Sequence, residues 1–210
     1  MTDWATISSV ATAGGTLVLA IATFGSVRSA NRSTRLSELA FQEQMRPMLV
    51  HSHLDDPLQS IRFGDGHRVE ADGGGAVVEE AEDNIYLAVS LRNVGAGIGV
   101  IQAWFPWSDE TKSDEHAALD QFRAQSRDFY IPPAGIGLWQ GALRDPSEEI
   151  YPLVTAACRQ RRPFSLELLY TDSTAAQRTI SRFIITPSDR SQRWTAEVVR
   201  NWHLDRRGPR

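Results

Sequence analysis

The sequence predicts a mainly β protein with N-terminal α structure: a transmembrane and juxtamembrane helix followed by an antiparallel β-sandwich, Ig-like or jelly-roll-like. Three observations support this prediction. An uncharged run extends from Trp4 to Val27. After Arg46-Pro47 the hydrophobic pattern changes from helical to period two. Short alternating segments bounded by turn residues then recur without βαβ alternation, which is typical of a sandwich or barrel.

The run at residues 4–27 is predicted to be a transmembrane helix. Asp, Glu, Lys and Arg are absent from it, and Arg28 ends it. Roughly 20 mostly apolar residues span the hydrocarbon core, and a helix satisfies its own backbone hydrogen bonds there. A cleaved signal peptide and a helix buried in a soluble fold are the alternatives. A signal peptide has a positive region before its apolar core, whereas here Asp3 precedes the run and arginines follow it.

The flanking charges predict the orientation. Arg28, Arg32 and Arg35 follow the run, and cytoplasmic flanks carry the basic excess. We therefore expect residues 1–3 to be a short extracytoplasmic N-terminus of a single-pass plasma-membrane protein, with all later residues cytoplasmic. The expected partner of residues 4–27 is the lipid bilayer. Small residues recur along one face of this helix, so a homo-oligomer is an alternative, through Ser9, Ala13, Thr16, Ala20 and Thr23.

Residues 28–46 are predicted to continue as a juxtamembrane helix. It is expected to end there, because Pro47 disfavours helix at the preceding residue. Residues 47–205 form the predicted β-sandwich domain, and 206–210 a basic C-terminal tail. Within the domain, residues 72–83 read as an exposed connection, and short helices are expected near 114–123 and 147–161. Strands are expected at 48–54, in a hairpin over 61–69, and at 84–92, 100–107 (as the partner of 84–92), 129–131, 136–143, 164–171, 177–186 and 194–202.

Composition narrows the function classes. The 210 residues carry a formal net charge of −4, so no global basic field indicates nucleic acid as a partner. Cys158 is the only cysteine, which excludes an intrachain disulfide and suits a reducing compartment.

Few residues offer catalytic chemistry. His51 and His53 lie two apart in a predicted strand, and imidazoles so spaced can share a metal. A metal-dependent hydrolase using this pair is therefore an alternative function. The run Gly95-Ala-Gly97-Ile-Gly99 is better explained by turn or bulge glycines than by a phosphate cradle, because the next residues alternate like a strand. G-x-S-x-G is absent. We assign no catalytic, cofactor-binding or metal-binding residue, expect no cofactor, and do not predict an enzyme.

Several short motifs nevertheless support a resemblance to other proteins. They are Arg46-Pro47, LRNVGAGI at residues 91–98, LLYTD at 168–172 with QRTISRF at 177–183, and VRNWHLDR at 199–206. In these the chain resembles uncharacterised bacterial single-pass membrane proteins with an N-terminal transmembrane helix and a C-terminal β-rich domain. The resemblance implies a shared architecture and no known activity. The last hairpin and final strand are candidates for a recognition surface, through Tyr170, Asp172, Arg178, Arg182 and Trp202.

The sequence thus favours a membrane-anchored binding module at the cytoplasmic membrane face, with an unknown protein partner. A structural, self-associating membrane protein is the second alternative to this function.

Overall fold

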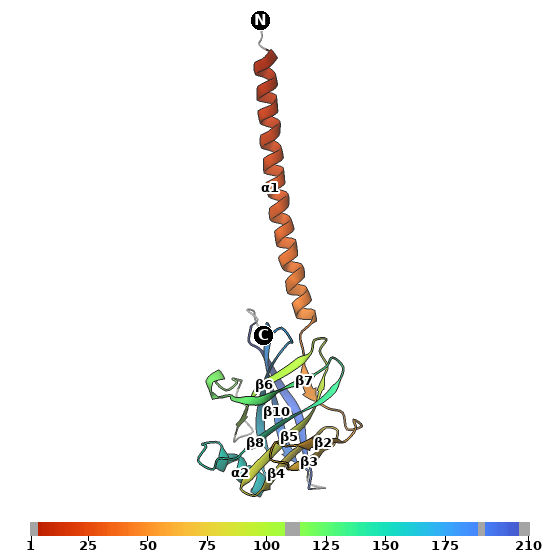
Figure 1. Cartoon of the computed structure of the whole chain (residues 1–210), viewed down its shortest axis with the longest axis vertical. Helices are drawn as coiled ribbons and strands as arrows, with labels where there is room; N and C mark the ends of the chain where they lie inside the picture. The colour runs from red at the N-terminus through yellow and green to blue at the C-terminus, as the bar shows by residue number, and fades with distance from the viewer. Residues whose placement is uncertain (1–3, 108–113, 189–191, 206–210) are drawn as a thin grey trace. The chain divides into compact units, whose positions relative to one another are not determined.

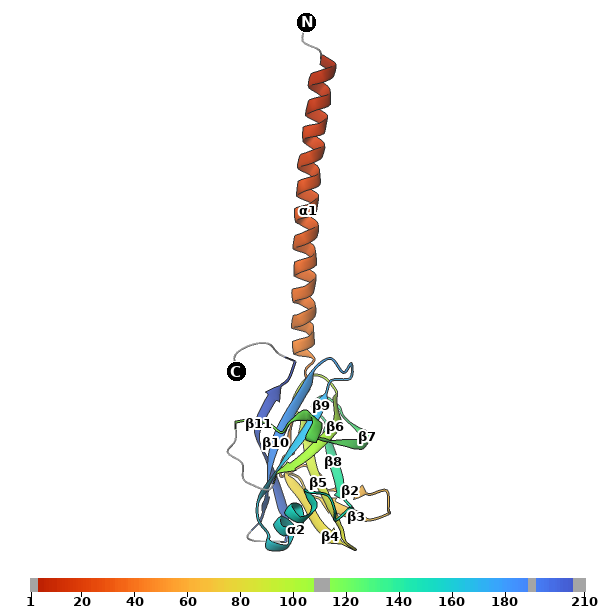
Figure 2. The ribbon, with the colours of Figure 1, turned by 90° about the vertical axis from the view of Figure 1, so that its left-hand side faces the viewer.

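The computed structural model describes residues 4–107, 114–188 and 192–205, with side chains from residue 12 onward. The chain divides into two compact units, Met1–Gln44 and Met45–Arg210. Figures 1 and 2 show the helix of the first unit and the strands of the second in two views. The predicted extracytoplasmic residues 1–3 and basic tail 206–210 lie outside the described residues.

The first unit is one helix, α1, over Trp4–Gln44. At 41 residues it measures roughly 60 Å, which exceeds the ~30 Å hydrocarbon core of a bilayer. Three hydroxyls in its uncharged part donate to the carbonyl four residues earlier: Thr16 at 2.9 Å, Thr23 at 2.8 Å and Ser26 at 2.9 Å. These polar side chains are therefore satisfied without water. The helix is long and apolar enough to cross a membrane.

The second unit is built on one antiparallel sheet, to which nine strands contribute among the described residues. A separate two-stranded hairpin, β2–β3, and the helix α2 complete it. The bounds are β1 Leu49–His51, β2 Gln59–Arg62, β3 Arg68–Ala71, β4 Gly75–Ala81, β5 Asn84–Asn93, β6 Gly99–Trp107, a 3-10 turn Leu119–Gln121, β7 Arg123–Ile131, β8 Ile136–Leu143, α2 Tyr151–Gln160, β9 Phe164–Thr171, β10 Arg178–Pro187 and β11 Trp194–His203.

The sheet curls so that the strands at its two ends, β7 and β8, approach each other. β5 pairs with β8 along one edge and with β4, then β1, along the other. From β4 the sheet continues through β11, β10, β9 and β6 to β7. The tight turn Pro132–Gly135, closed by a 3.0 Å hydrogen bond between the ends of that turn, then leads from β7 back to β8. The predicted fold class, mainly antiparallel β after an N-terminal helix, is confirmed, and all the described strands except β2 and β3 form one continuous curled sheet.

β5 is buried on both faces. Ile85, Leu87, Val89 and Leu91 point into the main core, and all are at most 2% exposed. The opposite face carries Tyr86 and Ala88 under the β2–β3 hairpin, which adds a second cluster through Ile61, Phe63, Val69 and Ala71. α2 lies at one end of the domain, beside β4 (Figures 1 and 2). It packs three further residues on the main core: Tyr151, Val154 and Ala157.

Two predictions about the strands are wrong. Residues 72–83 were expected to be an exposed connection, but Gly75–Ala81 is strand β4, in the interior of the sheet. Ala76 and Val78 point inward, so buried and outward-facing residues alternate along β4. The glycines and acidic residues around them make this alternation difficult to recognise in the sequence. Residues 100–107 were expected to pair with 84–92, yet β6 pairs with β7 and β9 instead. Strands that follow one another in the sequence are therefore not always neighbours in this sheet.

Asn93, at the end of β5, is fully buried and uses its whole amide. Its Oδ1 accepts from the N–H groups of Met48 at 3.1 Å and Gly95 at 3.0 Å. Its Nδ2 donates to the carbonyls of Gly97 at 2.7 Å and Ile131 at 3.0 Å. The nearby glycines permit this close approach, because a Cβ on Gly97 would lie 1.7 Å from the Met45 carbonyl oxygen. The glycine run is thus a turn against which the start of the domain packs.

Replacing Asn93 by alanine is expected to lower the free energy of unfolding of the domain by about 3 kcal/mol, because four backbone groups, two of them in buried hydrogen bonds, lose their partner. The control Asn84→Ala removes only local contacts near the surface, to the Glu82 carbonyl and to the Tyr86 hydroxyl, and should cost less than about 1 kcal/mol. Chemical denaturation of the full-length protein in detergent, followed by tryptophan fluorescence, measures both. Equal losses would contradict the role given to Asn93.

Candidate functional site

The two ends of the curled sheet, β7 and β8, meet without a ladder of backbone hydrogen bonds among the described residues. β7 is itself irregular here. Its register with β6 passes from Ile101↔Phe129 to Ala103↔Ala124, so four residues of β7, 125–128, face Gln102 alone. Such a bulge bends a strand and interrupts pairing. We call the resulting open line between β7 and β8 the seam.

Side chains bridge the seam in place of backbone. Gln125 Nε2 donates to the Gln140 carbonyl oxygen at 2.8 Å. The Oε1 of the same side chain accepts from Trp139 Nε1 at 3.2 Å. Arg127 Nη2 donates to Gln140 Oε1, also at 3.2 Å. The ends of the sheet are therefore joined by contacts that rotation of two side chains can release.

The free edge of β8 can be assigned from these contacts. In an antiparallel strand the N–H and C=O of one residue point to the same side, and successive residues alternate. Because the Gln140 carbonyl faces Gln125, residues 138, 140 and 142 present their backbone groups to the seam, whereas 139 and 141 face β5. β8 thus offers a row of backbone donors and acceptors on its open side.

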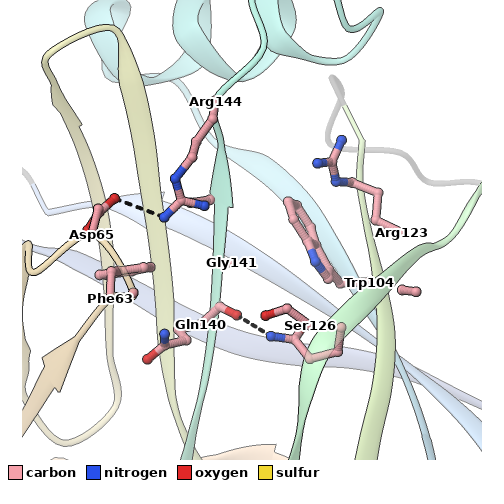
Figure 3. A pocket seen from close by; sticks show the side chains of 12 residues that line it. Phe63, Asp65, Trp104, Arg123, Ser126, Gln140, Gly141 and Arg144 are labelled. Atoms are coloured by element: carbon pink, nitrogen blue, oxygen red, sulfur yellow. Dashed lines mark hydrogen bonds and ion pairs between the residues drawn. The ribbon is translucent and has the colours of Figure 1, made fainter.

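The seam widens into a pocket of about 470 Å³ (Figure 3). This volume falls within the range of small-ligand sites, roughly 300–1,000 Å³. Gly141 helps to form it, since a Cβ there would lie 2.6 Å from the Trp139 ring and 3.0 Å from that of Trp104. Consecutive residues of both strands and the turn of the β2–β3 hairpin line the pocket: Phe63, Gly64, Asp65, Trp104, Arg123, Ala124, Gln125, Ser126, Gln140, Gly141, Ala142 and Arg144.

On one side of the pocket, Arg144 Nη2 pairs with Asp65 Oδ2 at 2.9 Å (Figure 3). Asp65 also accepts from the Tyr86 hydroxyl at 2.8 Å and from the His67 N–H at 3.0 Å. Burial alone would raise the pKa of Asp65, but these three donors outweigh it and lower the pKa to about 2. Asp65 is therefore an anion at neutral pH, and it holds Arg144 at the rim.

Arg123 lies on the other side, with its guanidinium 5.1 Å from the centre of the Trp104 ring. Both of its terminal nitrogens meet Glu148, with Nη2 at 3.2 Å from Oε1. Burial lowers the pKa of Arg123, yet a guanidinium stays charged at any physiological pH. The charged side chains that line the pocket are thus two cations and one anion. The arrangement suits a ligand with backbone-like polar groups and a carboxylate.

The histidine pair does not assemble a metal site. β1 ends at His51, so His53 lies beyond the strand. His51 Nδ1 instead accepts from the Val198 N–H at 3.2 Å, across to β11. Within the described residues, no group of three or more His, Cys, Asp or Glu side chains could hold a metal ion.

The five candidates in the last third serve the structure. Tyr170 is fully buried, and its hydroxyl accepts from the Leu49 N–H at 3.2 Å. Asp172 accepts from the N–H groups of residues 176 and 177, closing the β9–β10 turn. Arg178 pairs with Asp205 at 2.7 Å.

Arg182, 2% exposed, pairs with the fully buried Glu167 at 2.5 Å. Its guanidinium lies 5.4 Å from the Trp107 ring centre and 4.9 Å from that of Trp202. The predicted recognition surface is therefore largely interior packing.

Sequence reasoning missed the seam, because it placed only residues 129–131 of β7 in a strand. The alternation Arg123, Gln125, Arg127, Phe129 was present. Three of its members are polar, however, and a period-two pattern predicts a strand most readily when one side is apolar.

Comparisons with known proteins add little. No family model and no curated protein matches the chain. A crystal structure of a protein from Archaeoglobus fulgidus is similar over 71% of this chain and 96% of its own, at 7% identity, with a TM-score of 0.24. That score is too low to support an argument about fold or function.

The carboxylate of Asp65 should make stability depend on pH. Its folded pKa of about 2 lies below the ordinary value of 3.8, so its contribution is present above about pH 4 and lost as pH falls toward 2. A third of the side chain is exposed, which limits the contribution to roughly 1 kcal/mol. Unfolding of the wild type and Asp65→Asn, measured from pH 2 to pH 7, should differ at pH 7 and converge near pH 2. A constant difference would refute the assignment.

Proposed function

We propose that this chain is a single-pass membrane protein whose β domain binds a protein partner on the cytoplasmic side, at the seam between β7 and β8. The pocket in this seam is the observation that carries the proposal. It combines an open sheet edge, two arginines and a volume of about 470 Å³.

Support for the anchor comes from α1. Its side chains from Thr12 to Phe41 are exposed, and its hydroxyls are satisfied within the helix. An exposed apolar helix of this length needs an apolar environment. Arg28, Arg32 and Arg35 follow the apolar part within the same continuous helix, which favours a cytoplasmic location for the residues after it. The resemblance to single-pass bacterial proteins points the same way.

Support for binding comes from the β domain. The metal-hydrolase alternative needs His51 and His53 to converge with a carboxylate, and His51 is engaged by the backbone of β11 instead. Rigid strands hold both sides of the pocket, and exposed positions such as Ser126 make it accessible from solvent. A polar pocket beside an open strand edge suits a polypeptide.

Charges placed in the predicted span should abolish membrane anchoring. Leu17→Arg combined with Leu19→Arg adds roughly 6 kcal/mol to the free energy of insertion, at about 3 kcal/mol for each central arginine. We expect this double variant to leave the membrane fraction that resists alkaline carbonate. The matched control, Leu36→Arg with Leu39→Arg, changes the same residue type beyond Arg28 and should stay in that fraction. Release of both variants, or of neither, would contradict a span at residues 4–27.

Partner binding at the seam can be tested by photocrosslinking in native membranes. Benzoylphenylalanine placed at position 126, in the pocket, should give one discrete crosslinked partner. The same group at position 197, an exposed site on β11, is the control and should not capture it. Equal capture at both positions would place the interaction elsewhere. A crosslink to a second copy of the chain would favour the self-associating alternative.

A further inference from the structure

We infer that the seam accepts an extended, acidic segment of the partner protein, which adds to the free edge of β8 as a strand and places a carboxylate beside Arg144. This inference rests on the proposed function and specifies the chemistry of the partner at the same site.

The backbone of β8 supplies the first argument. Residues 138, 140 and 142 face the seam, and the Gln140 carbonyl is met there by a side chain instead of a strand. An unpaired edge is a template for another extended chain, and main-chain hydrogen bonds then provide much of the affinity. The pocket borders this edge over 140–142, the part nearest Arg144.

Charge supplies the second argument. Arg144 is about half exposed at the pocket rim, and only its Nη2 is engaged by Asp65. A guanidinium has five N–H donors, so Nε and Nη1 can still receive a carboxylate. Arg127, exposed on β7, adds a second positive group beside the seam. An acidic group placed at Arg144 therefore finds guanidinium donors that Asp65 does not use.

The bridging side chains supply the third argument. Gln125 contacts the Gln140 carbonyl and the Trp139 indole with the two ends of one amide, as a short piece of peptide would. It holds the edge in the free protein and must leave when a strand enters. Gln125→Ala should therefore strengthen binding, although it removes two hydrogen bonds from the free domain. If Gln125 only stabilised the domain, Gln125→Ala would weaken binding instead.

The test uses full-length protein in lipid nanodiscs and a displayed library of random octapeptides. Selected peptides should contain Asp or Glu and lack proline at their centre, since proline cannot donate to a ladder. Synthetic copies are then measured by fluorescence anisotropy. Changing the selected carboxylate to its amide, or Arg144 to Gln, should weaken binding about tenfold. The matched control is Arg178→Gln, which breaks an ion pair of similar exposure on β10 and should change affinity less than about twofold.

Hydrogen exchange shows whether the peptide adds as a strand. Bound peptide should slow exchange of the amides of residues 138, 140 and 142, while those of 139 and 141, already directed at β5, should change little. The inference would be overturned if protection were uniform or absent. It would also be overturned if the library yielded no peptide, if the selected peptides lacked acidic residues, or if Gln125→Ala bound the peptide more weakly. If position 126 still crosslinks a discrete partner, the proposed function survives such a failure. Loss of that crosslink would end both.

Discussion

Hydrogen bonds along both edges of β5, together with burial of both its faces, place most other elements of the domain. One face of β5 packs in the main core, which the curled sheet and α2 form. The other needs a cover, which the β2–β3 hairpin supplies through Ile61, Phe63, Val69 and Ala71. At the end of this strand, Asn93 connects the start of the domain, the glycine turn and the end of β7. Burying both faces of one strand therefore brings together segments more than 40 residues apart.

The same curling creates the seam. β7 and β8 are the strands at the two ends of the curled sheet, and no ladder joins them among the described residues, where β7 is bulged at residues 125–128. The side-chain amide of Gln125 then satisfies both the indole of Trp139 and the carbonyl of Gln140. Exchange of such contacts for those of a ligand costs little, because a hydrogen bond contributes only about 1 kcal/mol net. The least regular part of the sheet is thus the part that we propose for binding.

Electrostatics sets the character of the pocket. Asp65 and Glu148 each hold an arginine, so neither cation is left without a carboxylate in the free protein. The two pairs differ, however. Arg123 is engaged through both terminal nitrogens and lies against Trp104, whereas Arg144 is engaged through one and is half exposed. A ligand can therefore add to Arg144 without displacing Asp65.

The sequence by itself determined the long N-terminal helix, the antiparallel β class, and the two faces of strands such as 84–92 and 164–171. These properties depend on local periodicity and on the absence of charge over residues 4–27. Only the tertiary structure decided that Gly75–Ala81 lies inside the sheet, that β6 pairs with β9, and that Arg123, Gln140 and Arg144 line one pocket. The physical reason is that strand partners are chosen by long-range packing, which one strand's alternation does not encode.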